Sequence, residues 1–119
     1  MGRWAQAQRR GTVSPGETVG GGFPFSAPSG TDWIVNDSGI DTFDAQMLAT
    51  GSGHFRLEVT SSAHPLNIFQ DDEIAPGHAG GDLSAQFNSG DPYSARVRFI
   101  NVGGTPVSDW SAPKTGTFG

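Results

Sequence analysis

Hydrophobic and polar residues alternate one by one along several short segments after residue 22, and turn-forming residues separate these segments. Alternation with a period of two is typical of a β-strand that buries one face. The segments that show it are 32–36, 43–49, 54–60, 65–70, 83–87, 93–101 and 106–112. About seven short strands at even spacing predict an all-β fold, an antiparallel β-sandwich.

Two of these segments show the alternation most clearly. Their apolar faces consist of Phe55, Leu57 and Val59 in the first, and of Tyr93, Ala95, Val97 and Phe99 in the second. Each strand therefore covers a core with one face and presents the other to solvent or to a partner. Arg56, Arg96 and Arg98 fall on the polar faces, where we expect cross-strand pairs with Glu58 or other acidic residues.

The first 22 residues lack this pattern. Residues 1–11 are compatible with a short helix that is marginal in water by itself. Residues 12–22 are rich in Gly, Ser, Thr and Pro, and the run 20–22 is entirely glycine, which is typical of a linker. The chain is therefore predicted to consist of an N-terminal arm and linker, residues 1–22, and a β-sandwich domain, residues 23–119.

The composition changes this interpretation little. The chain has 119 residues, which suits one domain with a core of ordinary size. It contains 18 glycines and 8 prolines, and because these are the poorest helix formers, a helical fold is not expected. It contains no cysteine, which excludes disulfides and zinc sites built on cysteine.

Charge divides the chain at the same place as the hydrophobic pattern. Residues 1–22 carry three basic residues and one acidic residue, a net charge of +2, whereas residues 23–119 carry four basic and eleven acidic residues, a net charge of −7. An acidic domain repels phosphate, so we expect no nucleic-acid partner. No apolar run is long enough to cross a bilayer, so we expect no membrane partner.

A family resemblance appears in the last third of the chain, in the stretch SAQFNSGDPYSARVRFINVGGTPVSDWSAP. It resembles the last strands of a fibronectin type III domain, with a polar corner before Tyr93, an R-V-R alternation, Asn101, a glycine-containing hairpin and a closing SDWSAP. The segment GHFRLEV resembles the central strand of that family. The resemblance implies that Tyr93 turns its hydroxyl back onto nearby backbone. A jelly roll of the carbohydrate-binding kind is the alternative topology.

The sequence contains little that predicts catalysis. It has no nucleophile elbow, phosphate-binding loop or H-E-x-x-H zinc motif. His54 is predicted on a polar strand face, and His64 and His78 at turns, which favours surface histidines over a metal site. The acidic segment 71–73 lacks the ligand spacing of a calcium loop and is predicted to be a solvated loop. We therefore expect no enzyme activity, catalytic residue, cofactor or metal.

Aromatic residues are the remaining candidates for a binding role. Trp33 and Trp110 are candidates for exposed aromatic residues, which would stack on sugar rings or anchor a protein partner. The alternative for each is a position in the core. Phe23 and Phe25 are expected to cap the sandwich where the linker enters it.

The arm is the other candidate for binding. Ordering one backbone residue costs about 1–2 kcal/mol, so a glycine-rich arm is expected to become ordered only when another chain holds it. The indole of Trp4 would be the anchor, and Arg3, Arg9 and Arg10 would meet acidic groups or carbonyls.

A sandwich on such an arm resembles the small immunoglobulin-like or fibronectin-like proteins that decorate the heads or tails of tailed bacteriophages. That resemblance implies a virion location and, as partner, the major capsid protein or another virion structural protein. It is compatible with either a single copy or a homo-oligomer in the assembly. The alternative function is a carbohydrate-binding module of an adhesion apparatus, with a host-surface glycan as its ligand.

Overall fold

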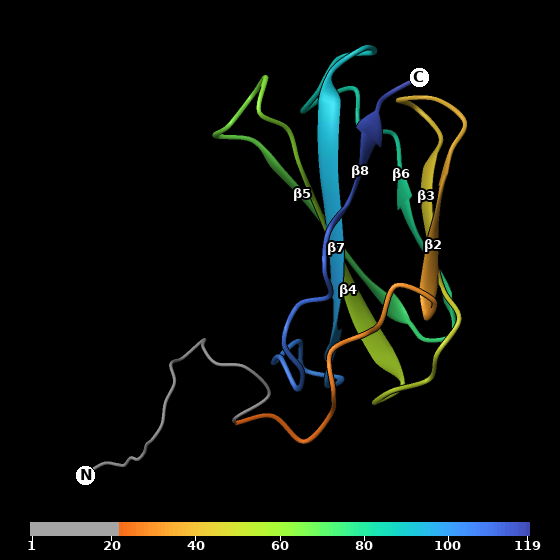
Figure 1. The fold of residues 1–119 in the computed structure, drawn as a ribbon, viewed down its shortest axis with the longest axis vertical. Coiled ribbons are helices and arrows are strands. Elements are labelled where there is room, and N and C mark those ends of the chain that lie inside the picture. Colours follow the sequence, from red (N-terminus) through yellow and green to blue (C-terminus); the bar gives the residue numbers. More distant parts are fainter. Residues whose placement is uncertain (1–21) are drawn as a thin grey trace, which may run out of the picture.

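The computed structural model of the protein describes residues 22–119, and their strands form two antiparallel sheets (Figure 1). The strands are β2 (Trp33–Asp37), β3 (Phe43–Met47), β4 (His54–Thr60), β5 (Ile68–Ile74), β6 (Gly77–Gly81), β7 (Pro92–Ile100) and β8 (Lys114–Thr117). One sheet has the order β2-β3-β6 and the other β5-β4-β7-β8. The prediction of an all-β sandwich of about seven strands is confirmed. None of the described residues belongs to a helix long and apolar enough to cross a membrane.

The core lies between the two sheets, where the alternating apolar residues meet. Strand β4 buries Phe55, Leu57 and Val59 and leaves its other side chains partly exposed, as its sequence predicts. From the opposite sheet, β3 contributes Phe43, Ala45 and Met47. Burying side chains of this size is the main source of the stability of the fold.

Two of the predicted strands are wrong. Segment 83–87 forms a turn, in which the carbonyl of Leu83 accepts hydrogen bonds from the N–H groups of Gln86 and Phe87. Leu83 and Phe87 are nevertheless buried, so their apolar character reflects core packing without a strand. Segment 106–112 has only an isolated bridge at Pro106, and the last strand, β8, starts two residues after that segment ends.

Strand β6 was not predicted from the sequence, because three of its five residues are glycine. Glycine weakens an isolated strand, but it is required here by the geometry. Gly80 has a φ of +131°, and a Cβ at this position would lie 2.2 Å from the carbonyl oxygen of Phe43 on the neighbouring strand. The close pairing of β3 and β6 therefore selects glycine at Gly80.

The start of β7 differs from what the family resemblance implies. The Tyr93 ring packs against Phe43 and Phe118, with centroid separations of 5.2 and 5.0 Å. Burial, and next the charge of Asp37, raise the pKa of its hydroxyl. Within residues 22–119, no hydrogen bond joins this hydroxyl to the backbone, and a Cβ at Gly116 would lie 2.6 Å from its oxygen. The expected backbone contact of Tyr93 is therefore not present.

This arrangement predicts that Tyr93→Phe changes the free energy of unfolding by less than about 0.5 kcal/mol, because the ring contacts stay and no hydrogen bond is lost. Tyr93→Ala should cost several times more, because it removes the ring from the core. Urea denaturation of the two variants measures both values. A loss of more than about 1 kcal/mol in Tyr93→Phe would show that the hydroxyl is bonded after all.

The described residues begin and finish at opposite ends of the sandwich (Figure 1). Near the start, the N–H of Phe25 donates to the carbonyl of Val107, and the Phe25 ring meets the Phe99 ring edge-on. The ring of Phe23 lies 5.7 Å from the guanidinium carbon of Arg98. The Phe25 ring thus packs at the end of the sandwich at which the chain enters, as expected from the sequence, whereas Phe23 lies over Arg98 on the outer face of the four-stranded sheet.

Candidate functional site

The candidate residues of the arm, Arg3, Trp4, Arg9 and Arg10, lie outside the described residues. Their role as partner-binding residues, and the boundary between arm and domain, therefore stay predictions. The other sequence-predicted candidates, Trp33 and Trp110, lie within the sandwich and have different environments.

Trp33 is a core residue. It opens β2 opposite Met47 of β3, and its side chain is 0% exposed. The ammonium of Lys114 lies 5.2 Å from the ring centroid and donates to the carbonyl of Gly30. Of the two interpretations that the sequence allowed, the structure gives the core position, so Trp33 as an exposed ligand-binding aromatic is wrong. A fully buried ring cannot stack on a sugar without unfolding its surroundings.

Trp110 lies half-buried against the outer face of the four-stranded sheet. The guanidinium carbons of Arg96 and Arg98 lie 4.1 and 4.6 Å from its ring centroid, which is cation–π distance. Burial is the main cause that lowers the pKa of Arg98. The ring of Trp110 is therefore occupied by side chains of β7.

Two serines fix the segment that carries Trp110. The N–H of Phe99 donates to Oγ of Ser108 over 2.9 Å, and the N–H of Val97 donates to Oγ of Ser111 over 3.1 Å. The Nε of Arg98 donates to the carbonyl of Ser108 over 3.1 Å. These contacts satisfy backbone groups of β7 beyond the reach of β8, and they hold the indole over the arginines.

Of the three arginines on this face, Arg56 and Arg96 pair with acidic residues across strands, as the sequence predicts. Arg56 binds the carboxylate of Asp72 through two nitrogens, over 2.7 and 2.9 Å, and this contact raises the pKa of Arg56. Arg96 binds Glu58 over 2.7 Å. Arg56 also donates to the carbonyl of Gly104. The charged groups of this face are thus engaged with one another, which leaves it few free groups for a ligand.

A groove of about 380 Å³ lies on another side of the molecule, where β3 and β6 of one sheet approach β5 of the other. Its lining residues are Asp41, Thr42, Phe43, Asp44, Asp71, Glu73, His78, Ala79, Gly80 and Gly81. Four of these are acidic, and one is a histidine. Because they come from three strands and one turn, this grouping depends on sheet register and could not be seen in the sequence.

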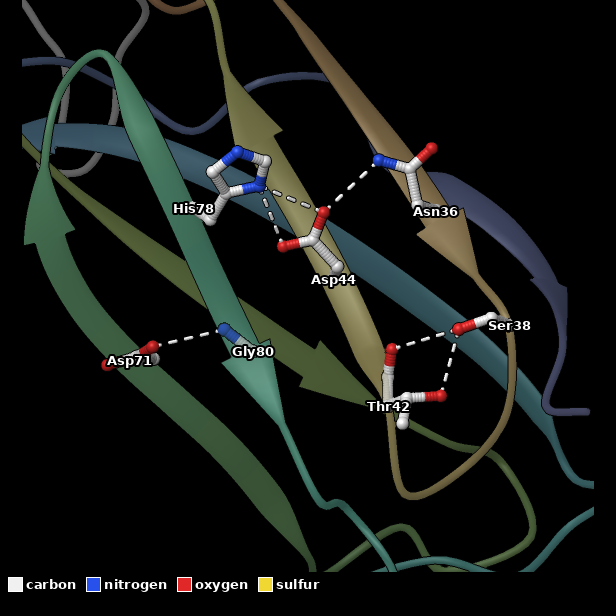
Figure 2. A network of polar contacts seen from close by, with 7 residues as sticks. All are labelled: Asn36, Ser38, Thr42, Asp44, Asp71, His78 and Gly80. Atoms are coloured by element: carbon white, nitrogen blue, oxygen red, sulfur yellow. Dashed lines mark hydrogen bonds and ion pairs between the residues drawn. The ribbon is translucent and has the colours of Figure 1, made fainter.

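The outer face of the three-stranded sheet carries a short polar chain across its strands (Figure 2). Both carboxylate oxygens of Asp44 lie 3.0 Å from Nδ1 of His78, and the amide of Asn36 donates to Asp44 over 3.1 Å. His78 lies in β6, so the prediction of a turn position is wrong. The signal that could have indicated the pair is charge complementarity across β3 and β6, but it needs the correct register.

On the other side of the groove, the acidic segment 71–73 forms part of β5, so the predicted solvated loop is also wrong. Asp72 points to the outer face, where Arg56 binds it. Asp71 and Glu73 point to the opposite face, and Oδ2 of Asp71 accepts the N–H of Gly80 over 3.0 Å (Figure 2). The hydrogen bond with Asp71 is the main cause that raises the pKa of Glu73.

Within residues 22–119, no three His, Asp or Glu side chains come together in a geometry that could hold a metal ion. The surface of the groove is acidic, and two of the side chains that line it, Asp44 and His78, are hydrogen-bonded to each other.

No protein-family model matches the chain, and no curated protein matches it either.

Proposed function

We propose that this chain is a non-enzymatic structural protein of a virus particle, a capsid-decoration or head-fibre type module of a bacteriophage. Its N-terminal arm docks on the shell, through contacts with the major capsid protein or another virion structural protein. Its sandwich is displayed outward. The fibronectin type III resemblance belongs to this proposal, and it is supported by the division of the strands into β2-β3-β6 and β5-β4-β7-β8.

The observation that carries the proposal is the position of the chain's entry into the sandwich. The described residues start at one end of the long axis, and Gly119 lies at the other (Figure 1). An arm that precedes residue 22 therefore meets the domain at a single end. If that end faces a shell, the opposite end and both sheet faces are available for display. The basic arm and the acidic domain, with net charges of +2 and −7, also suit two different environments.

The alternative, a carbohydrate-binding module, receives less support from the aromatic residues. Trp33 is buried, and Trp110 stacks on two arginines. A sugar that stacked on a ring face of Trp110 covered by a guanidinium would have to displace that group and give up a cation–π contact, which is worth about 0.5–2 kcal/mol.

The proposal predicts that Trp4→Ala abolishes incorporation into particles while the sandwich stays folded. An indole buried in a partner removes about 150–250 Å² from water, which can offset the ordering cost of the arm. Arg9→Ala combined with Arg10→Ala should weaken incorporation in a manner that depends on salt concentration. Occupancy of the variant proteins in purified particles measures the effect.

Trp110→Ala is the matched control, because it removes the same side chain from the sandwich and should leave incorporation unchanged. Full occupancy of Trp4→Ala would place the contact in the sandwich and contradict the docking role of the arm. A glycan-binding screen with and without residues 1–22 distinguishes the alternative. Sugar binding that does not need the arm would favour the carbohydrate-binding module.

A further inference from the structure

The end of the sandwich at which the chain enters, the entry end, is built from four segments. They are residues 22–31, the β3–β4 connection 48–53, the β5–β6 turn 75–76 and the loop 101–107 after β7. Figure 1 shows them in the lower half of the domain. The N–H of Phe25 donates to the carbonyl of Val107, which joins the first segment to the last, and the carbonyl of Gly53 accepts the N–H of Ala75, which joins the other two.

These four segments contain no Asp, Glu, Lys or Arg, although the domain as a whole carries eleven acidic and four basic residues. Asp32, next to the first segment, is bound to the N–H of Ser29. The connections at the opposite end contain three acidic residues, Asp41, Asp82 and Asp91. The cores of protein interfaces are depleted in charged groups, because charges lose their hydration when they are covered. The entry end is therefore the part of this acidic domain that another protein can cover at the lowest cost.

Exposed apolar side chains gather at the same end. Among residues 22–119, seven large apolar side chains are exposed, and four of them lie in or directly beside the entry-end segments. They are Phe25, Leu48, Ile74 and Val102. Val102 is 86% exposed, the highest value of the four. A single exposed apolar residue is ordinary, but apolar residues that share an uncharged surface indicate an interaction site.

Hydrogen bonds fix the loop that carries Val102. Oδ1 of Asn101 accepts the N–H groups of Gly103 and Thr105, each over 2.9 Å. The guanidinium of Arg56 donates to a carbonyl of the same loop over 3.0 Å. Val102 is thus held in position before any partner binds, which reduces the entropy lost on binding.

We propose that the entry end is a second contact with the structural protein that the arm binds, with Val102 as its central apolar residue. This inference rests on the proposed function, because the arm joins the sandwich at this end. A protein held by Trp4 meets the entry end as an intramolecular event, at an effective concentration on the order of millimolar. The partner surface over Val102 is apolar and uncharged, since a charged group there would lose its hydration and find no opposite charge at the entry end.

Virus particles assembled without this chain are the probe. The full chain is added back, and the concentration that gives half-maximal occupancy is measured. Val102→Asp should raise this concentration about tenfold or more, because it removes an apolar contact and buries a carboxylate. Val102→Thr, which has the same shape and no charge, should raise it about threefold. The urea denaturation midpoints should stay unchanged, because the Val102 side chain contributes little to the core.

Leu66→Asp is the matched control. It introduces the same charge in place of a side chain that is 94% exposed at the opposite end, and it should bind as the wild type does. If Leu66→Asp weakened binding as much as Val102→Asp, charge repulsion would explain both losses and the contact would be wrong. Wild-type binding of both Val102 variants, together with loss of binding in Trp4→Ala, would also overturn the contact and leave docking by the arm in place. The reverse result would keep the contact and contradict the docking role of the arm.

Sedimentation velocity of the full chain without particles tests a second copy as the occupant of the entry end. The chain should sediment as a monomer at micromolar concentration. A dimer that Val102→Asp dissociates would assign the entry end to self-association and overturn the proposal.

Discussion

Replacing Trp33 with alanine should reduce the free energy of unfolding by about 3–5 kcal/mol, the range for deleting a large aromatic side chain from a core. The ring is 0% exposed and belongs to the cluster between the sheets. Alanine would leave a cavity that the closely paired β2 and β3 cannot close. Because small domains are stable by only about 5–15 kcal/mol, this one substitution should remove much of the stability.

Urea denaturation of Trp33→Ala and Trp33→Phe measures the effect. Nε1 of Trp33 has no hydrogen-bond partner among the described residues, so Trp33→Phe loses ring volume and no hydrogen bond. It should cost clearly less than Trp33→Ala. Trp110→Ala, at a half-buried position, should also cost less. Equal losses in Trp33→Ala and Trp110→Ala would contradict the assignment of Trp33 to the core and Trp110 to the outer face.

The different environments of the two tryptophans could not be predicted from the sequence alone. Trp33 stands between Asp32 and Ile34, and Trp110 stands between Asp109 and Ser111. A strand pattern alone does not say which face of such a segment is covered. Trp33 falls on the inner face because β2 pairs with β3 in the register that sets it opposite Met47. Trp110 lies outside a regular strand, and its position depends on serine contacts to β7. Neither determinant is local in sequence.

The strands themselves were predictable where burial alternates strictly. Strand β4 has the predicted bounds, and β7 differs from its prediction by one residue at each end. Both are central strands whose side chains face a core on one side and solvent on the other. In β5 the inward face changes along the strand from the apolar Phe69 to the acidic Asp71 and Glu73. The predicted strand 65–70 therefore covers only the first three residues of β5, and 71–73 were predicted as a loop. Edge strands often carry inward charges, which weakens their period-two signal.

Polar contacts were predictable only where the choice of partner was narrow. Arg56 and Arg96 had to find acids on adjacent strands, and each did so. The pairing of Asp44 with His78 and the contact of Asp71 with Gly80 both require β6, which the glycine-rich sequence concealed. Because β6 was not predicted, the groove that it lines could not be predicted either.

Gly80→Ala should destabilise the domain by about 2–4 kcal/mol. Two effects combine at this position. The φ of +131° is strained for any residue with a Cβ, and the new methyl group would lie 2.2 Å from the Phe43 carbonyl oxygen and 3.0 Å from its carbon. These are backbone atoms of a paired strand, so relief requires that β3 and β6 separate. That separation would also displace the N–H that Asp71 binds.

Gly81→Ala provides a control that isolates the second effect. Gly81 has the same φ of +131°, but a Cβ at this position has no heavy atom within 4 Å. Its cost should therefore be that of backbone strain alone, about 1–3 kcal/mol. The difference between the two variants in thermal or urea denaturation measures the steric contact between β3 and β6. If both variants lost the same stability, the close approach of the strands would contribute nothing, and the requirement for glycine in β6 would come from backbone conformation only.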